Sequence, residues 1–304
     1  MDKDKNEVLI SDFFTDEYRT WYRITNPAAL HDKAPIIVLH GGPGAGHDYM
    51  LPYTDLTVTG RSVIHYDQVG CGRSSHLVHK PKSFWQVQPF VEQLELLIKH
   101  LKIDQIVLLG HSWGGILATE YAIKHDDQIE KLILSSCPSA MKRWEATGKR
   151  LINELPEKYI QAFKLLSDGA SVDRQLLDEA IDLYTLKFCE NIPEAEKPDY
   201  LKHSAQEMNN DGTTYDYMWG RAEPIVNSGN LANWDAEDRL HNITTPTLVI
   251  AGEHDEAGIE ATKNFSKITG FVKEIRYPGG AHIYHITNHN EVIADVSSFI
   301  NGSN

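Results

Sequence analysis

The segment GHSWGG at residues 110–115 places Ser112 in a G-x-S-x-G pattern, an arrangement that exposes a serine nucleophile. Glycines on either side tolerate the strained backbone of a sharp strand-to-helix turn, which pushes the serine hydroxyl out of the sheet. The backbone N–H of Trp113 would then lie at a helix N-terminus and face a developing oxyanion. These residues indicate acyl-transfer chemistry, provided that a buried strand precedes Ser112 and a helix follows it.

A second oxyanion donor is expected from HGGPG at residues 40–44, which ends an earlier apolar run. Its glycines let the backbone approach a substrate oxygen closely, and Pro43 stiffens the turn. We assign this role to the N–H of Gly42, with Gly41 as the alternative. The expected oxyanion hole is therefore formed by Gly42 and Trp113.

A base and an acid must follow the nucleophile, in the chain order Ser, Asp or Glu, His. In the segment GGAHIYH, His282 follows the last strand pattern and is the expected general base. The segment AGEHDEAG follows the preceding strand pattern and contains a cluster of carboxylates. Asp255 is the expected orienting acid, because the turn GEHD brings its side chain toward His282. Glu253 is the competing choice and is otherwise expected to be a turn or surface residue.

Two further histidines follow the expected base. His285 and His289 lie four positions apart, but no third ligand or HExxH context supports a metal site. We expect both to be solvated surface residues, and we expect the protein to use neither a metal nor a cofactor.

The charge balance limits the possible partners. Lys and Arg number 29 and Asp and Glu number 43, which gives a net charge of −14 over 304 residues. Nucleic acids and anionic membranes both reward basic patches, so the balance argues against either partner. No apolar run approaches the roughly 18 residues that a membrane span needs. We expect no secretory signal, and three cysteines without CxxC spacing favour a reduced, cytoplasmic protein.

Hydrophobic patterning predicts the elements that must position these groups. Strand patterns, most of them continuous apolar runs typical of strands buried on both faces, cover residues 34–42, 61–68, 104–110, 130–136, 245–255 and 273–280. Helical patterns alternate with them at residues 84–102, 114–125, 260–268 and 291–300. Strands that alternate with helices imply a doubly wound, mostly parallel sheet. Alternation of apolar and polar residues before residue 30 predicts half-buried antiparallel strands.

Residues 140–235 interrupt this alternation. They are polar, mostly helical in pattern and punctuated by prolines, and they contain no buried strand pattern. A helical insertion between two strands predicts a cap over the carboxyl edge of the sheet, where such folds bind ligands. We therefore expect a core of residues 1–139 and 236–304 with a helical cap at 140–235.

Together these motifs resemble the proline iminopeptidase family of α/β-hydrolases, which includes L-proline amide hydrolases. The similarity extends over nearly the whole chain and rests on HGGPG (40–44), DQVGCGRS (67–74), GHSWGG (110–115), GEHDE (252–256) and GGAH (279–282). HGGPG together with DQxGCGRS is specific to this group, whereas G-x-S-x-G and the final His are shared by the superfamily. Val69 departs from the pattern, because the family usually has Arg there.

The resemblance implies an α/β-hydrolase fold and hydrolysis of an unblocked N-terminal amino acid, often proline, through an acyl-enzyme. In the family, acidic residues hold the free amine of the substrate, one directly after the triad Asp and one in the cap. They correspond here to Glu256 and to Glu223 in the stretch MWGRAEP. An α-amine is largely ammonium at neutral pH, and a carboxylate in a closed pocket is its natural partner. We expect Glu256 to point away from His282 toward that ammonium.

Three classes of protein remain open. The first is an aminopeptidase or amino-acid amidase that takes small peptides or amino-acid amides, with proline or small apolar residues preferred. A carboxylesterase or lipase would use the same triad without an anionic pocket, and its cap would be more apolar. A non-catalytic binding protein is disfavoured because Ser112, Asp255 and His282 are all present. Ser112 also excludes a dehalogenase or epoxide hydrolase, which needs Asp at that position. The sequence leaves the oligomeric state open.

Overall fold

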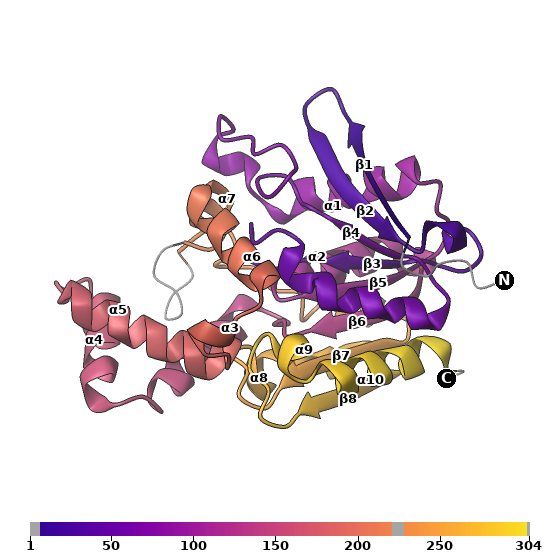
Figure 1. Cartoon of the computed structure of the whole chain (residues 1–304). Helices are drawn as coiled ribbons and strands as arrows, with labels where there is room; N and C mark the ends of the chain where they lie inside the picture. The colour runs from indigo at the N-terminus through magenta and orange to yellow at the C-terminus, as the bar shows by residue number, and fades with distance from the viewer. Residues whose placement is uncertain (1–6, 221–227, 303–304) are drawn as a thin grey trace.

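The computed structural model describes residues 7–220 and 228–302. Within these residues the chain forms an eight-stranded sheet in the order β1-β2-β4-β3-β5-β6-β7-β8 (Figure 1). Its strands are β1 Val8–Phe14, β2 Arg19–Thr25, β3 Ile36–Leu39, β4 Val63–Tyr66, β5 Ile106–His111, β6 Ile129–Ser135, β7 Thr247–Gly252 and β8 Val272–Tyr277. β1, β2 and β4 pair antiparallel in turn, and all other neighbours are parallel. The mostly parallel sheet predicted from the sequence is confirmed.

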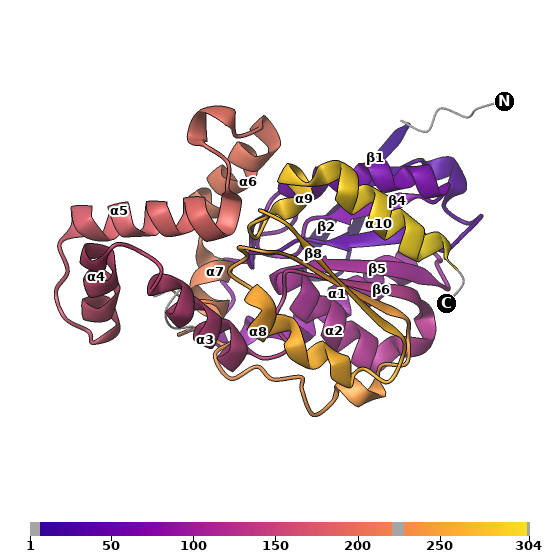
Figure 2. The same cartoon turned by 90° about the horizontal axis from the view of Figure 1, so that it is seen from below.

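Helices cover both faces of this sheet, which makes it doubly wound (Figure 2). One face carries α1 Val87–His100, α2 Trp113–His125 and α8 Gly258–Thr262, and the other carries the 3-10 segment Asp48–Thr59, α9 Tyr284–Thr287 and α10 His289–Asn301. Strand β3 shows why the central strands read as unbroken apolar runs. Ile37 and Leu39 belong to the core cluster on the α1 and α2 face, whereas Ile36 and Val38 belong to the opposite cluster. Because successive side chains enter different cores, every position must be apolar.

Between β6 and β7 the chain leaves the sheet and forms a helical insertion. Its elements are α3 Met141–Ile152, α4 Glu157–Ser167, α5 Arg174–Tyr184, the π-helix Thr185–Glu190, α6 Asp199–Asn210 and α7 Thr213–Met218. Figures 1 and 2 show α4 and α5 projecting away from the sheet, while α6 and α7 lie closer to it.

The two ends of the insertion meet in a short neck formed by residues 139–141 and 234–236. Ala140 forms an isolated antiparallel bridge with Asp235, and the Met141 N–H donates to the Trp234 carbonyl at 2.9 Å. The neck coincides with the boundaries expected from the sequence, and the division into core and cap stays a prediction.

One predicted helix is shorter than expected. The pattern at residues 260–268 corresponds to the end of α8 followed by the 3-10 turn Lys263–Lys267.

In the part of the chain that the structure describes, no helix combines the length and the apolar composition that crossing a bilayer requires.

Candidate active site

Ser112 lies at the turn between β5 and α2, as the G-x-S-x-G pattern predicts. Its φ is +57° and its ψ is −124°, a combination that is strained for a residue with a Cβ. Close packing of the strand against the helix explains the flanking glycines. A Cβ on Gly110 would lie 2.1 Å from the Gly114 carbonyl oxygen, and a Cβ on Gly114 would lie 2.2 Å from that of Leu39. The turn thus holds the Ser112 hydroxyl at the edge of the sheet.

Asp255 and His282 are brought together from the turns after β7 and β8. The His282 Nδ1–H donates to Asp255 Oδ1 at 2.8 Å, and Ser136 Oγ donates to Asp255 Oδ2 at 2.5 Å. Burial would raise the pKa of Asp255, but the charge of His282 and the hydrogen bonds from His282, Ser136 and the Ala257 N–H hold it below its usual value. An ionised Asp255 keeps the proton on Nδ1, so Nε2 is the ring atom of His282 that can accept another proton.

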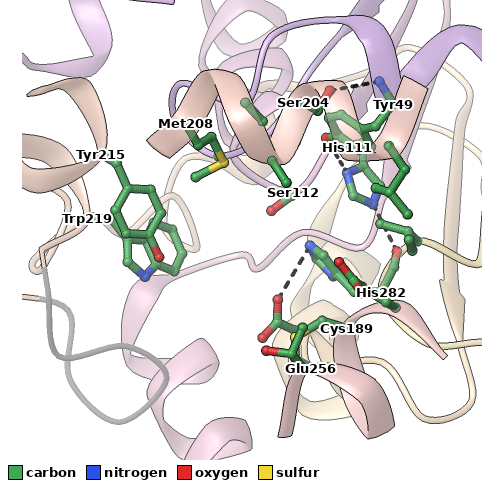
Figure 3. A pocket seen from close by; sticks show the side chains of 17 residues that line it. Tyr49, His111, Ser112, Cys189, Ser204, Met208, Tyr215, Trp219, Glu256 and His282 are labelled. Carbon is green, nitrogen blue, oxygen red and sulfur yellow. Dashed lines mark hydrogen bonds and ion pairs between the residues drawn. The ribbon is translucent and has the colours of Figure 1, made fainter. Parts of the chain in front are cut away.

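Glu256 does not point away from His282, which corrects the expectation from the sequence. Its Oε1 lies 3.7 Å from His282 Nε2, and its side chain also lines the pocket (Figure 3). The reason is local. Asp255 and Glu256 lie in a turn, so the alternation that sends successive strand residues to opposite sides does not apply. The two carboxylates therefore approach the imidazole at different nitrogens.

These neighbours determine the titration of the imidazole. Burial by itself would lower the pKa of His282, but the negative charges of Asp255 and Glu256 outweigh it and raise that pKa. Burial raises the pKa of the Glu256 carboxyl, which His282 partly opposes. Among the described contacts, no hydrogen bond joins the Ser112 hydroxyl to His282. Of the described charged groups, the nearest to His282 Nε2 is thus Glu256, at 3.7 Å.

The backbone contacts favour Gly42 over Gly41 as an oxyanion donor. The Gly41 N–H donates to Tyr49 Oη at 2.7 Å and is already used. No acceptor for the N–H groups of Gly42 or Trp113 is found among the described residues. Trp113 opens α2, where a backbone N–H has no partner within the helix. Its side chain is buried and its Nε1–H donates to Gln68 Oε1 at 2.7 Å, so only its backbone is offered to the site.

The pocket of about 300 Å³ lies between these turns and the insertion. Ser112, His282 and Glu256 line one side of it, and Tyr215 and Trp219 lie across from them (Figure 3). Helix α6 contributes Leu201, Ser204, Ala205 and Met208. The wall supplied by α6, α7 and Trp219 is therefore largely apolar. The π-helix of the insertion adds Thr185, Cys189 and Glu190, whose carboxylate pairs with Lys197 at 2.6 Å.

The π-helix Thr185–Glu190 is part of the site and was not anticipated. The Phe188 carbonyl accepts hydrogen bonds from the N–H groups of Glu256 at 3.2 Å and His282 at 3.0 Å. The adjacent Cys189 carbonyl accepts from the Ile283 N–H at 2.9 Å. The backbone of the insertion therefore fixes both turns that carry acid and base groups. Hydrophobic periodicity cannot distinguish a π-helix from an α-helix, so the sequence carried no signal for it.

Only one of the two histidines that follow the base, His289, lies at the surface as expected. His285 is buried rather than solvated, and its Nε2–H donates to the Tyr49 carbonyl at 3.2 Å. Burial lowers the pKa of His285 to about 3. His289 is partly exposed and pairs with Asp55 at 2.9 Å. Glu253 is exposed and accepts from the Gly279 N–H at 3.0 Å, which confirms it as a turn residue.

Glu223 lies outside the described residues, so its expected contact with the substrate amine stays a prediction. Within residues 7–220 and 228–302, no cluster of three or more His, Cys, Asp or Glu side chains is arranged to hold a metal ion.

A family model described as the alpha/beta hydrolase fold matches residues 34–289. A proline iminopeptidase of Heyndrickxia coagulans is 32% identical, over 88% of this chain and 90% of that protein. Another, from Saccharolobus solfataricus, is also 32% identical, over 87% of this chain and 84% of that protein. The chain belongs to the proline iminopeptidase family of α/β-hydrolases. Membership in this family makes it an enzyme, a hydrolase of the aminopeptidase type.

Solved structures agree with this membership. The proline iminopeptidase of Mycobacterium smegmatis matches with a TM-score of 0.86 and 31% identity, over 96% of this chain and 97% of that one. VinJ matches with a TM-score of 0.88 and 31% identity, over 96% and 98%. The family resemblance and the fold class drawn from the motifs are confirmed.

Proposed function

We propose that this member of the proline iminopeptidase family is a serine aminopeptidase that releases an unblocked N-terminal residue from small peptides, amides or arylamides. The observation that carries the proposal is that Ser112, His282 and Glu256 line the same pocket. A serine and an imidazole serve acyl transfer in general. A buried carboxylate beside them serves a substrate that brings a positive charge, because an unpaired buried charge is costly. A neutral ester brings no positive charge for that carboxylate to bind.

In the proposed reaction, Ser112 Oγ attacks the carbonyl carbon of the N-terminal residue while His282 Nε2 takes the hydroxyl proton. Asp255 stabilises the imidazolium that forms. The N–H groups of Gly42 and Trp113 hold the oxyanion of the tetrahedral intermediate. The imidazolium then gives its proton to the leaving amine, which breaks the C–N bond and leaves an acyl-enzyme. Water, activated by the same imidazole, attacks the acyl-enzyme and releases the amino acid.

The shape of the pocket supports a small first residue. Its volume of about 300 Å³ lies at the low end of ligand pockets. The apolar wall formed by Met208, Tyr215 and Trp219 suits proline or a small apolar side chain, whose burial is favourable there. Glu256 on the opposite side of the pocket would hold the ammonium, and Glu223 is proposed as its second partner.

Rates on matched pairs of free and N-acetylated Pro-, Ala- and Leu-arylamides test this proposal. We expect turnover of the free substrates alone, because acetylation removes the charge that Glu256 is proposed to bind. Equal rates on free and blocked substrates would refute the amine requirement. Ser112→Ala is the control for the nucleophile, and full activity in that variant would show that another group attacks the carbonyl.

A further inference from the structure

One buried phenol and one buried imidazole connect the three turns of the proposed site. The Gly41 N–H lies 2.7 Å from Tyr49 Oη, and Tyr49 Oη lies 2.8 Å from His111 Nδ1. On the far side of the ring, His111 Nε2 lies 2.9 Å from the His282 carbonyl oxygen. Tyr49 is 5% exposed and His111 is 1% exposed, so water does not compete for these bonds.

The carbonyl at one end fixes the direction of every proton in this chain. Because the His282 carbonyl oxygen can only accept, Nε2 of His111 carries a hydrogen. Burial and the nearby His282 and His285 hold the pKa of His111 well below its usual value, so the ring is neutral. His111 Nδ1 is then a lone-pair acceptor for the Tyr49 hydroxyl, whose own oxygen accepts from the Gly41 N–H. Successive hydrogen bonds in one direction polarise and strengthen one another.

Three of the four members of the chain, all except Tyr49, lie at or next to a residue of the proposed reaction. Gly41 precedes the oxyanion donor Gly42, and His111 precedes the nucleophile Ser112. His282 is the base itself. These three turns follow different strands, β3, β5 and β8, and the hydrogen-bonded chain links them across the sheet edge.

We propose that Tyr49 and His111 are positioning residues that hold the oxyanion turn, the nucleophile turn and the base turn in register for acyl transfer. The inference rests on the proposed function for the roles of Ser112 and His282. Neither positioning residue exchanges a proton with the substrate. Their effect comes through geometry, because a misplacement of about 1 Å at a reacting group costs on the order of 100-fold in rate.

Tyr49→Phe is the first test, because it removes one hydroxyl and keeps the ring that lines the pocket. We expect kcat on a free arylamide to fall about 10- to 100-fold while KM changes by less than about threefold. Tyr53→Phe is the matched control. It removes the same group from a fully buried tyrosine that stacks on His285 at 5.1 Å and does not line the pocket. An increase in KM without a decrease in kcat, or equal decreases of kcat in both variants, would overturn the proposal.

His111→Gln provides a second, independent break in the same chain. If the two residues act as one unit, the double variant of His111→Gln and Tyr49→Phe should be no less active than the less active of the two single variants. Losses that multiply would show that the residues act separately and would overturn the proposal. If thermal unfolding shows that Tyr49→Phe does not fold, His111→Gln alone tests the proposal, and an unchanged kcat in that variant would overturn it.

Labelling of Ser112 by a fluorophosphonate separates this inference from the proposed substrate. In that reaction the serine oxygen attacks phosphorus and fluoride leaves, with no amine involved. The labelling rate should fall in Tyr49→Phe and stay unchanged in Tyr53→Phe. Absence of an amine requirement in the wild type would refute the substrate proposal, whereas an unchanged labelling rate in Tyr49→Phe would refute the positioning role.

Discussion

Replacement of Glu256 by Gln removes one charge and almost no volume from the pocket. That charge lies 3.7 Å from His282 Nε2, and in the proposed complex it faces the substrate ammonium. The side chain is 9% exposed, so neither interaction is strongly screened by water. The substitution therefore changes both substrate binding and the titration of the base.

The effect on binding follows from the strength of a charge-assisted hydrogen bond. Such a bond contributes about 1.5–3 kcal/mol, and about 1.4 kcal/mol corresponds to a factor of ten. We expect kcat/KM for a free prolyl arylamide to fall about 10- to 150-fold in Glu256→Gln, mainly through KM. A neutral ester makes no such bond, and its KM should stay unchanged.

The effect on pH dependence has a definite sign. Glu256 helps to raise the pKa of His282, so its neutralisation lowers that pKa. His282 must be unprotonated to act as a base, and the acid limb of kcat/KM follows its titration. The limb should move to lower pH in Glu256→Gln. It is measured with a neutral ester, so that titration of the substrate amine does not contribute.

Glu253→Gln is the matched control for both effects, since it makes the same change in the same turn at an exposed side chain. It should leave KM and the acid limb as in the wild type. The reasoning is refuted if Glu256→Gln keeps kcat/KM for the free arylamide within about threefold of the wild type. Equal losses on arylamide and ester would instead show that Glu256 acts on the geometry of the site. An acid limb that moves to higher pH would contradict the electrostatic role.

Two further predictions concern stability. Gly115→Ala should lower the free energy of unfolding by about 1–3 kcal/mol, because the new Cβ would lie 2.4 Å from the Cys137 side chain. Denaturant unfolding measures this, and Gly212→Ala, whose Cβ would meet no atom closer than 3.9 Å, should cost far less. Hydrogen bonding from Arg143 lowers the pKa of Glu237 to about 2, so its stabilisation is complete above its ordinary value of 4.5 and lost as pH falls through about 2. Glu237→Gln should therefore be less stable than the wild type above pH 4.5, with a difference that narrows at lower pH; a difference independent of pH would contradict this linkage.

The parts of the site that depend on local secondary structure could be predicted from the sequence. A buried strand, a tight turn and a helix define the place of Ser112. The ends of the last two strands likewise define Asp255 and His282. Each is a local consequence of hydrophobic periodicity and turn chemistry, which one sequence displays directly.

The parts that depend on packing between distant segments could not be predicted. His285 is buried against the ring of Tyr53, which stacks on it, and its Nε2–H donates a hydrogen bond to the Tyr49 carbonyl. The backbone N–H of Glu256 donates to the Phe188 carbonyl of the insertion, which fixes the turn that carries this carboxylate. None of these three partners is close in sequence to the residue that it contacts, and hydrophobic periodicity does not report such contacts.

The neck, with its bridge between Ala140 and Asp235, holds the two ends of the helical insertion together at the sheet. Because the ends of the insertion already meet, the cost of closing it grows only slowly with the length between them. The segment between these two ends can therefore change in length at little cost in conformational entropy. Any altered insertion must still place two carbonyl oxygens where those of Phe188 and Cys189 accept hydrogen bonds from the N–H groups of the site turns. Changes in the insertion therefore act on the proposed site and also on packing, because Trp144 and Trp219 belong to the core cluster on the α1 and α2 face.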